Sequence, residues 1–231
     1  MPGVVAEARG PGWLGLQVTA PYKKLVCGLV DEVEADAAAI GAVNSIARSA
    51  DGWLVGFNTD APGFRAGVEL VLGRPLAGLD VVVVGAGGAA HAVVFACLHA
   101  GARRLTLGNR TLPAAVVGVD ATALDSPDFL AAVRSADLAV NATTVGMLHP
   151  GMTIPVDELP AHATVFDLVY VPFETELLAA AHARGLRAAN GSEMLIAQAA
   201  IAFERWTGVG GMADVMRAAV APLFADPNAL A

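Results

Sequence analysis

A run of four valines that leads directly into a glycine-rich turn, VVVVGAGGAAHA (81–92), constrains the fold of this chain most. Consecutive β-branched residues favour a strand that is buried on both faces of a parallel sheet. Gly85, Gly87 and Ala90 then form a GxGxxA arrangement, which suits a tight turn, close backbone approach to a pyrophosphate, and close packing of helix on strand. The sequence therefore predicts a strand, a turn and a helix whose N-terminus can bind an anion.

The same segment allows two other interpretations. Residues 81–98 carry no formally charged side chain and approach the length of a transmembrane helix, but three glycines interrupt them. Glycines also form turns in folds that bind no ligand, so GxGxxA alone is a weak signal. Its position between a valine strand and a helix is the context that the motif requires. We therefore expect nucleotide contacts from Gly85, Ala86, Gly87, Gly88 and Ala89.

Strand-like and helix-like segments alternate along the rest of the chain. Because alternating strands and helices fold as a parallel sheet covered on both faces, the pattern predicts an α/β fold. Strands are predicted within 14–20, on both sides of the Asp51-Gly52 turn in 42–58, at both ends of 78–111, and within 137–147, 163–170 and 186–191. Helices are predicted after the glycine turn and over 22–41, 61–73, 126–136, 174–184, 193–209 and 212–224.

Bulk composition limits the partners and the compartment. The 231 residues, 55% hydrophobic and 16% charged, suffice for one large domain or two small ones. A net charge of −8 argues against nucleic acids and anionic membranes as main partners. Cys27 and Cys97 form no disulfide framework and lack metal-ligand spacing with the histidines, and no leader pattern opens the chain. We therefore expect a cytoplasmic protein without a metal site.

The end of the next predicted strand bears on the choice of cofactor. In NAD sites an acidic residue there binds the ribose hydroxyls, but this chain has LGNRT (107–111), with Arg110 at about that position. A guanidinium suits a 2′-phosphate through paired, charge-assisted hydrogen bonds. A solvated surface arginine is the ordinary alternative. The position favours NADP and leaves NAD use open.

The polar motifs of the chain, taken in order from about Gly15 to Phe224, resemble those of shikimate dehydrogenases. Any one of them is a weak signal, whereas the ordered set is very specific. The motifs are GLQVTAPYKK (15–24), GAVNS (41–45), GFNTDAPGF (56–64), GAGGAAHA (85–92), NRT (109–111), NATTVGM (141–147), YVPFET (170–175) and NGSEMLIAQAAIAFERWTG (190–208).

The resemblance implies a Rossmann-type doubly wound parallel sheet plus a smaller α/β substrate domain formed by both chain ends. It assigns residues 61–190 to NADP binding and residues 1–60 with 191–231 to substrate binding, with a cleft between them. The implied activity is reversible NADP-dependent reduction of 3-dehydroshikimate to shikimate. A quinate/shikimate dehydrogenase that uses NAD, and a shortened nucleotide-binding homologue without catalysis, stay open as alternatives. A homodimer also stays open.

Lys23 and Asp60 are the catalytic pair that the resemblance implies. Hydride transfer to a ketone leaves an alkoxide, and an ammonium group at hydrogen-bond distance can polarise the carbonyl and supply the proton. A neighbouring carboxylate would orient the lysine, keep it charged and accept from a substrate hydroxyl. Without the resemblance, the ordinary interpretation of Lys23 is a solvated lysine like Lys24. The ordinary interpretation of Asp60 is the N-cap of the helix after Pro62.

The resemblance also implies further contacts. Thr19, Asn44, Tyr170 and Gln198 join Asp60 as substrate-binding residues. Ordinary roles fit them too: Asn44 as a turn cap, Tyr170 as a half-buried ring, and Gln198 as a water-facing residue of an alanine-rich helix. Cofactor contacts beyond the glycine turn are implied for Asn109, Arg110, Thr111, Thr143, Gly191 and Met194.

Three features depart from the family pattern. No Ser-x-Ser pair, which in the family binds the substrate carboxylate, precedes Lys23. An N-terminally shortened sequence, a homologue that has lost activity, or another chain that fills the gap would each account for this. Gln17 replaces the usual Asn and is one methylene longer. Pro113 and Ala114 stand where the family often has another basic residue, which weakens the preference for NADP.

Overall fold

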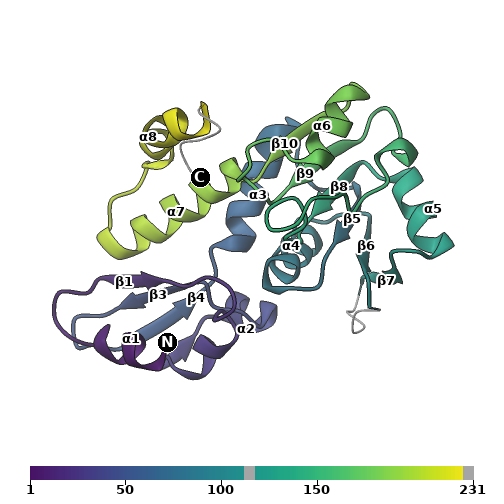
Figure 1. Cartoon of the computed structure of the whole chain (residues 1–231). Helices are drawn as coiled ribbons and strands as arrows, with labels where there is room; N and C mark the ends of the chain where they lie inside the picture. Colours follow the sequence, from purple (N-terminus) through teal and green to yellow (C-terminus); the bar gives the residue numbers. More distant parts are fainter. Residues whose placement is uncertain (112–117, 226–231) are drawn as a thin grey trace.

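The glycine turn follows a central strand of a six-stranded parallel sheet. The computed structural model describes residues 1–111 and 118–225, whose strands form this sheet and a smaller one of four strands (Figure 1). The larger sheet has the order β10-β9-β8-β5-β6-β7, and every pairing in it is parallel. The predicted α/β fold with a Rossmann-type sheet is confirmed. The strands are β5 (Asp80–Val84), β6 (Arg104–Asn109), β7 (Asp120–Ala123), β8 (Leu138–Asn141), β9 (Thr164–Asp167) and β10 (Arg187–Asn190).

The strand order of the larger sheet reverses beside β5, and the reversal locates a crevice. From β5 the chain runs outward through β6 and β7, then returns to β8 and continues outward on the other side through β9 and β10. The connections after β5 and β8 therefore diverge, which opens a crevice at the carboxyl ends of these strands. Val84 pairs with Gly108 of β6 and Asn141 of β8, so the residues that follow these three strands meet at one edge.

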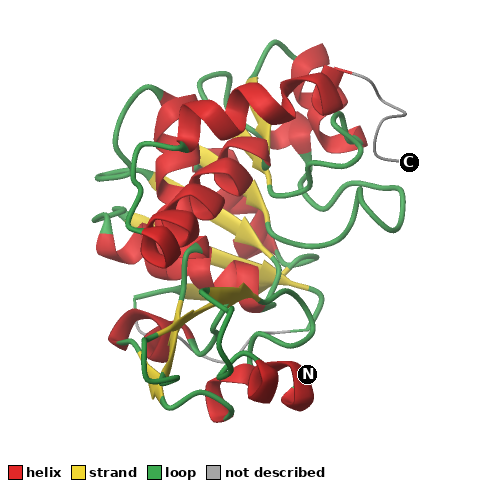
Figure 2. Ribbon diagram, turned by 90° about the vertical axis from the view of Figure 1, so that its left-hand side faces the viewer, coloured by secondary structure: helices red, strands yellow, loops and turns green. Residues whose placement is uncertain are grey.

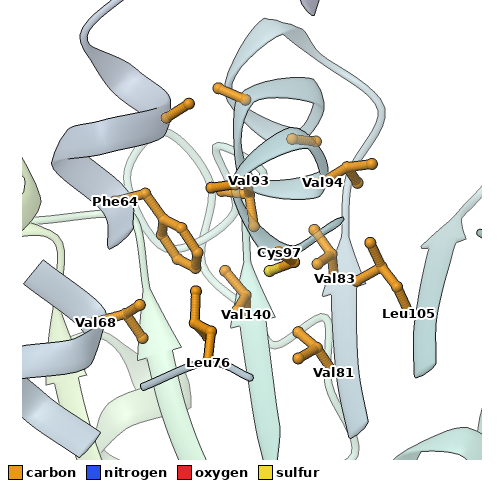
Figure 3. Close-up of a cluster of buried hydrophobic side chains, with 14 of the residues drawn as sticks. Phe64, Val68, Leu76, Val81, Val83, Val93, Val94, Cys97, Leu105 and Val140 are labelled. Atoms are coloured by element: carbon orange, nitrogen blue, oxygen red, sulfur yellow. The ribbon is translucent and has the colours of Figure 1, made fainter. Parts of the chain in front are cut away.

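Alternate valines of β5 contact opposite layers of helices. Val81 and Val83 belong to the hydrophobic cluster that Phe64 joins from one layer, whereas Val82 and Val84 belong to the cluster on the other face. Figure 3 shows the first cluster, and Figure 2 shows helices packed in front of the large sheet. The run is buried on both faces, which explains why it contains no polar residue. The helices are α3 (Asp60–Leu72) and α4 (Gly88–His99) on one face, and α5 (Pro127–Ser135) and α6 (Glu176–Ala183) on the other.

The apolar segment 81–98 divides between β5 and α4, as the glycine pattern predicts. Within residues 1–111 and 118–225, no helix is long and apolar enough to cross a bilayer. Cys97 of α4 is fully buried in the first cluster, and burial raises the pKa of its thiol to about 12. The Cys97 side chain therefore packs as a small apolar group and is not a nucleophile.

The smaller sheet is mixed and is built from the first part of the chain. Its order is β1-β3-β4-β2, antiparallel except for the β2–β4 pair. β3 and β4 form the predicted hairpin around Asp51-Gly52, where Gly52 has a φ of 89° that favours glycine. Val5 of α1 (Pro2–Glu7) packs against its buried face. The strands are β1 (Gly15–Gln17), β2 (Glu32–Val33), β3 (Ser45–Arg48) and β4 (Leu54–Phe57).

The single helix predicted over 22–41 is wrong. The chain there forms the 3₁₀ turn η1 (Leu25–Gly28), then β2, then α2 (Ala35–Ile40). Long-range pairing overrides helix propensity because β2 bonds to β4 and the Asp31 carboxylate accepts from the backbone N–H of Leu54 at 2.8 Å. The sequence pattern also misses α1, β7 and the 3₁₀ turn η2 (Val156–Glu158), which are too short to show a period.

Two glycines bring helices from opposite halves of the chain into backbone contact. α7 (Ser192–Thr207) packs along α3, and Gly63 and Gly67 of α3 lie on the shared face. A methyl group at Gly67 would lie 2.7 Å from the backbone N of Met194, and one at Gly63 would lie 2.8 Å from Cβ of Gln198. The two helices can approach this closely because neither position carries a side chain.

The last described helix, α8 (Ala213–Ala225), is tied to the start of α7. The Arg217 guanidinium donates to both carboxylate oxygens of Glu193 at 2.8 to 3.1 Å, and this interaction raises the pKa of Arg217. The assignment of residues 1–60 with 191–231 to one domain and of 61–190 to the other remains a prediction.

Replacing Gly67 with alanine should separate α3 from α7. We expect Gly67→Ala to lower the free energy of unfolding by about 2 kcal/mol, because the new methyl group overlaps backbone atoms of α7. Urea denaturation followed by circular dichroism measures the change. Gly3→Ala is the control, since Gly3 is also helical and has nothing within 4 Å of its Cβ position. Equal stability of the two variants would contradict the close-packing explanation.

Candidate active site

A cleft of about 250 Å³ lies at the crevice predicted from the strand order. Its lining comes from the segment after β1, from the start of α3 and α4, from the loops after β8 and β9, and from α7. Residues from both ends of the chain therefore share one site. The predicted site residues that line it are Thr19, Lys23, Asp60, Ala89, Thr143, Tyr170, Gly191, Met194 and Gln198.

Lys23 and Asp60 form an ion pair at the wall of this cleft. The Lys23 Nζ donates to Asp60 Oδ2 at 2.7 Å, and the two side chains are 18% and 3% exposed. Asp60 is the first residue of α3, but it does not cap that helix, so the N-cap interpretation is wrong. The Asn58 Oδ1 accepts from the backbone N–H groups of Asp60 and Ala61 instead, at 2.9 and 3.2 Å. The Asp60 carboxylate is thereby left free to bind the ammonium group.

Asn44 holds the second oxygen of that carboxylate. It is fully buried, and its Nδ2 donates to Asp60 Oδ1 at 2.8 Å, to Thr59 Oγ1 at 3.0 Å and to Gln198 Oε1 at 3.2 Å. Its Oδ1 accepts from the Thr59 backbone N–H at 2.8 Å, which orients the amide. An NH₂ group has two hydrogens for these three acceptors, so the longest contact, to Gln198, is the one most easily exchanged. Gln198 lines the cleft.

The glycine turn presents free backbone amides to the same region. Gly85 has a φ of 124°, and a Cβ there would lie 2.8 Å from the Ala142 carbonyl oxygen. Gly87 is the N-cap of α4 and provides no capping side chain, and its Cβ position has nothing within 4 Å. The first-turn N–H groups of α4 therefore open onto space that an anion can fill. A Cβ at Gly88 would lie 3.8 Å from Lys23 Cδ, so the turn adjoins the ion pair.

The predicted 2′-phosphate residues lie outside the cleft lining, at the carboxyl end of β6. Asn109 is the last residue of this strand, and its Nδ2 donates to the Thr111 carbonyl oxygen at 2.9 Å. Arg110 is exposed between them. Because β6 is the neighbour of β5, Arg110 lies one strand away from the glycine turn. Pro113 and Ala114 fall outside the described residues.

Two family descriptions match the ends of the chain. "Shikimate dehydrogenase substrate binding domain" matches residues 1–46, and "Shikimate 5'-dehydrogenase C-terminal domain" matches residues 191–221. Among curated proteins, the shikimate dehydrogenase (NADP(+)) of Sphingopyxis alaskensis is 43% identical, over 93% of this chain and 80% of its own length. The chain belongs to the shikimate dehydrogenase family.

Two solved structures are similar to this chain over most of its fold. The shikimate 5-dehydrogenase of Thermus thermophilus, in complex with NADP(H) and shikimate, has a TM-score of 0.85 and 37% identity. That similarity covers 96% of this chain and 83% of the other. The quinate dehydrogenase of Corynebacterium glutamicum, in complex with NAD, has a TM-score of 0.86 and 35% identity, over 96% and 82% of the two chains.

One departure of this chain from the shikimate dehydrogenase motif has a defined place in the structure. Gln17 is at the end of β1, and its Oε1 accepts from the Ser45 hydroxyl at 2.9 Å. The Ser45 Oγ also lies 3.2 Å from Asn44 Oδ1. Gln17 does not line the cleft. Its longer side chain reaches the hydrogen-bond network of Asn44 through the Ser45 hydroxyl.

Sequence reasoning missed several residues that line or support the cleft. Asn58 lies in the same motif as Asp60, and only its capping geometry shows its role. The other lining residues are apolar or small and carry no chemical signal of their own, and most of them lie within the motifs quoted for the resemblance. They are Ala20, Ala142, Thr144, Met147, Leu168, Val169 and Leu195.

Two titratable side chains near the cleft, His91 and Cys27, are not part of its lining. Burial lowers the pKa of His91 on α4, and the Lys24 charge lowers it further, so the ring is neutral at physiological pH. The Cys27 thiol contacts the Lys23 carbonyl oxygen at 3.5 Å. In the described part of the chain, no three His, Cys, Asp or Glu side chains gather as metal ligands.

Removing the Asn44 amide should destabilise the fold around Asp60. We expect Asn44→Leu to lower the free energy of unfolding by about 3 kcal/mol, because a buried carboxylate oxygen and the buried Thr59 N–H lose their partner. Asn109→Leu is the control, since the Asn109 side chain makes an exposed hydrogen bond to the Thr111 carbonyl oxygen only two residues away, and we expect a loss of about 0.5 kcal/mol or less. Urea denaturation measures both. Similar losses would show that Asn44 does not hold Asp60.

Proposed function

We propose that this chain catalyses the reversible, NADP-dependent reduction of 3-dehydroshikimate to shikimate. The observation that carries the proposal is the Lys23–Asp60 ion pair, which lies in one cleft with the first turn of α4. A proton donor and an anion-binding turn in one cleft are what a nicotinamide-dependent ketone reductase needs. The 43% identity to a shikimate dehydrogenase (NADP(+)) supports the choice of substrate.

The ion pair supplies the proton of the proposed reaction. NADPH, when bound, supplies the hydride that the carbonyl carbon receives. The Lys23 ammonium donates a hydrogen bond to the carbonyl oxygen, polarises it and transfers one proton to the alkoxide that forms. The Lys23 side chain is 18% exposed, so its amine regains a proton from water. In the reverse direction the neutral amine removes the proton from the hydroxyl.

Asp60 keeps the ammonium aimed during this exchange. Its Oδ2 accepts from Lys23, and its Oδ1 is held by Asn44, so the carboxylate cannot rotate without breaking a buried hydrogen bond. We assign to Asp60 the further role of accepting from a ring hydroxyl of the substrate.

The other predicted residues keep their proposed roles. Thr19, Tyr170 and Gln198 line the cleft and offer hydroxyl and amide groups to a polyol, and Asn44 adjoins them through Gln198. The glycine turn of residues 85–89 suits the pyrophosphate. Arg110, with Asn109 and Thr111, suits the 2′-phosphate. Residues proposed beside the nicotinamide are Thr143, Gly191 and Met194, which line the cleft.

A quinate/shikimate dehydrogenase that uses NAD is the second candidate function. The TM-score of 0.86 with a quinate dehydrogenase in complex with NAD supports it. So does the exposed position of Arg110, which loses little if no phosphate is bound. Rates with shikimate and quinate, each with NADP and NAD, distinguish the two candidates.

The proposed reaction belongs to aromatic amino acid biosynthesis by way of chorismate. The free thiols of Cys27 and Cys97 suit the reducing cytoplasm, where we expect it to occur. A homodimer, and the lack of nucleic-acid and membrane partners, stay predictions.

Replacing Lys23 should abolish turnover and spare cofactor binding. We expect Lys23→Ala to lower kcat about 100-fold or more, because the proton donor is lost. The dissociation constant of NADPH, measured by fluorescence, should change little, since Lys23 does not form the glycine turn. Lys24→Ala is the matched control, because Lys24 is the exposed neighbour and does not line the cleft. Undiminished turnover by Lys23→Ala would refute the assignment.

Arg110 should decide the preference for NADP. We expect Arg110→Ala to raise the KM for NADP about 10-fold and to leave the KM for NAD nearly unchanged, because only NADP carries the 2′-phosphate. Arg104→Ala is the control, since Arg104 is an exposed arginine at the opposite end of the same strand. Steady-state kinetics with both cofactors measure the effect. Equal shifts for the two cofactors would disprove the 2′-phosphate role.

A further inference from the structure

Asp167 is a fully buried carboxylate that the proposed chemistry does not use. It is the last residue of β9, at the edge of the sheet where the cleft opens. Its Oδ2 accepts from the Thr175 hydroxyl at 2.7 Å, and its Oδ1 accepts from Asn141 Nδ2 at 2.8 Å and from the Val169 backbone N–H at 3.0 Å. Burial raises the pKa of Asp167, and these three hydrogen bonds oppose that effect.

The bond to Asn141 links Asp167 to the loop after β8. Asn141 Nδ2 also donates to the Val145 carbonyl oxygen at 3.1 Å. Asn141 Oδ1 accepts from the Thr143 backbone N–H and hydroxyl, at 3.1 and 2.7 Å, and from the Thr153 hydroxyl at 3.2 Å. One side chain therefore fixes both ends of a loop that lacks regular secondary structure. That loop contributes Thr143 and Met147, with their neighbour Thr144, to the cleft.

The other two bonds link Asp167 to the loop after β9. Val169 lines the cleft together with its neighbours Leu168 and Tyr170. Thr175 ends this loop and caps α6, because its hydroxyl accepts from the Leu178 backbone N–H at 3.3 Å while it donates to Asp167. The two loops also touch each other, since a Cβ at Gly146 would lie 3.0 Å from the Thr175 side chain.

A carboxylate in this position costs stability. Neutral donors hold Asp167, and within the described residues no charged group is a cause of its raised pKa. Burying an anion without a counter-charge is unfavourable, and an apolar core is often more stable. The acceptor capacity of a carboxylate, which can bind donors from two loops at once, is the property that an apolar side chain lacks.

We propose that Asp167 is a positioning residue, which joins the loops after β8 and β9 into one rigid wall of the cleft and thereby sets the affinity for the nicotinamide end of the cofactor. The inference rests on the proposed function for the identity of that cofactor. Asp167 touches neither cofactor nor substrate in this role, and it acts through the positions of Thr143, Val169 and Tyr170.

The test compares two buried carboxylates of the same sheet. Asp167→Asn places an NH₂ group against the Thr175 hydroxyl, which then loses its acceptor. Asp80→Asn is the matched control, because Asp80 is 8% exposed, accepts two 2.8 Å bonds from Arg103, and lies at the opposite end of the strands. For each variant the dissociation constant of NADPH is measured by its fluorescence, with kcat and the stability to urea.

We expect Asp167→Asn to weaken NADPH binding at least 10-fold and to lower kcat at least 10-fold. We expect Asp80→Asn to lose stability but to keep both values within twofold of the parent protein. Thr175→Val and Thr175→Ser form a second pair, in which Val removes the donor to Asp167 and Ser retains it, so only Val should weaken NADPH binding.

Two results would overturn the inference. One is NADPH binding within twofold of the parent in both Asp167→Asn and Thr175→Val; the other is an equal loss of binding in Asp80→Asn, which would indicate general destabilisation. A parent protein that binds NADPH but does not turn over shikimate would refute the proposed function alone. The comparison of NADPH affinities would still decide the role of Asp167.

Discussion

Backbone contact between α3 and α7 is the constraint on which the cleft depends. α3 begins with Asp60, and α7 carries Met194 and Gln198, so the distance between these helices sets the distance across the site. Gly63 and Gly67 permit this approach because larger residues would overlap the α7 backbone. Once the helices are in contact, Asn44 reaches both Asp60 and Gln198, and the carboxylate is fixed in the orientation that binds Lys23.

Polar residues at the ends of strands hold the loops that follow the large sheet. Four strands of the large sheet end in an amide or carboxylate side chain: Asn109, Asn141, Asp167 and Asn190. Three of them donate to a loop carbonyl oxygen, as Asn190 does to Phe173 at 2.9 Å, and Asp167 accepts from a loop amide. Loops at a binding edge carry buried backbone groups that need partners, and polar strand ends supply them. The loops that line the cleft are thus held in place by hydrogen bonds from residues, such as Asn141 and Asp167, that take no part in the proposed proton transfer.

Local patterns predicted the parts of the fold that local physics controls. The valine strand, the glycine turn, the hairpin at Asp51-Gly52 and the helix of residues 60–72 follow from side-chain period and turn chemistry. The prediction of a helix over 22–41 was wrong because β2 forms only through its pairing with β4, and a distant pairing leaves no pattern in the local sequence. The site residues were predicted from the family resemblance and not from local patterns. By themselves, Lys23, Asp60 and Gln198 are indistinguishable from ordinary surface or capping residues, and only the ordered set of motifs identified them as candidates.

The sequence by itself determined the central βαβ unit, the glycine turn and the family, because these depend on residues that are neighbours in the chain or belong to fixed motifs. Tertiary structure decided which side chains act together. Lys23 and Asp60 are 37 positions apart in the sequence, and Asn141 and Asp167 are 26 positions apart; packing and the order of the strands bring each pair together. A hydrogen bond depends on distance in space, and a chain specifies that distance only after its helices and strands have buried their apolar faces.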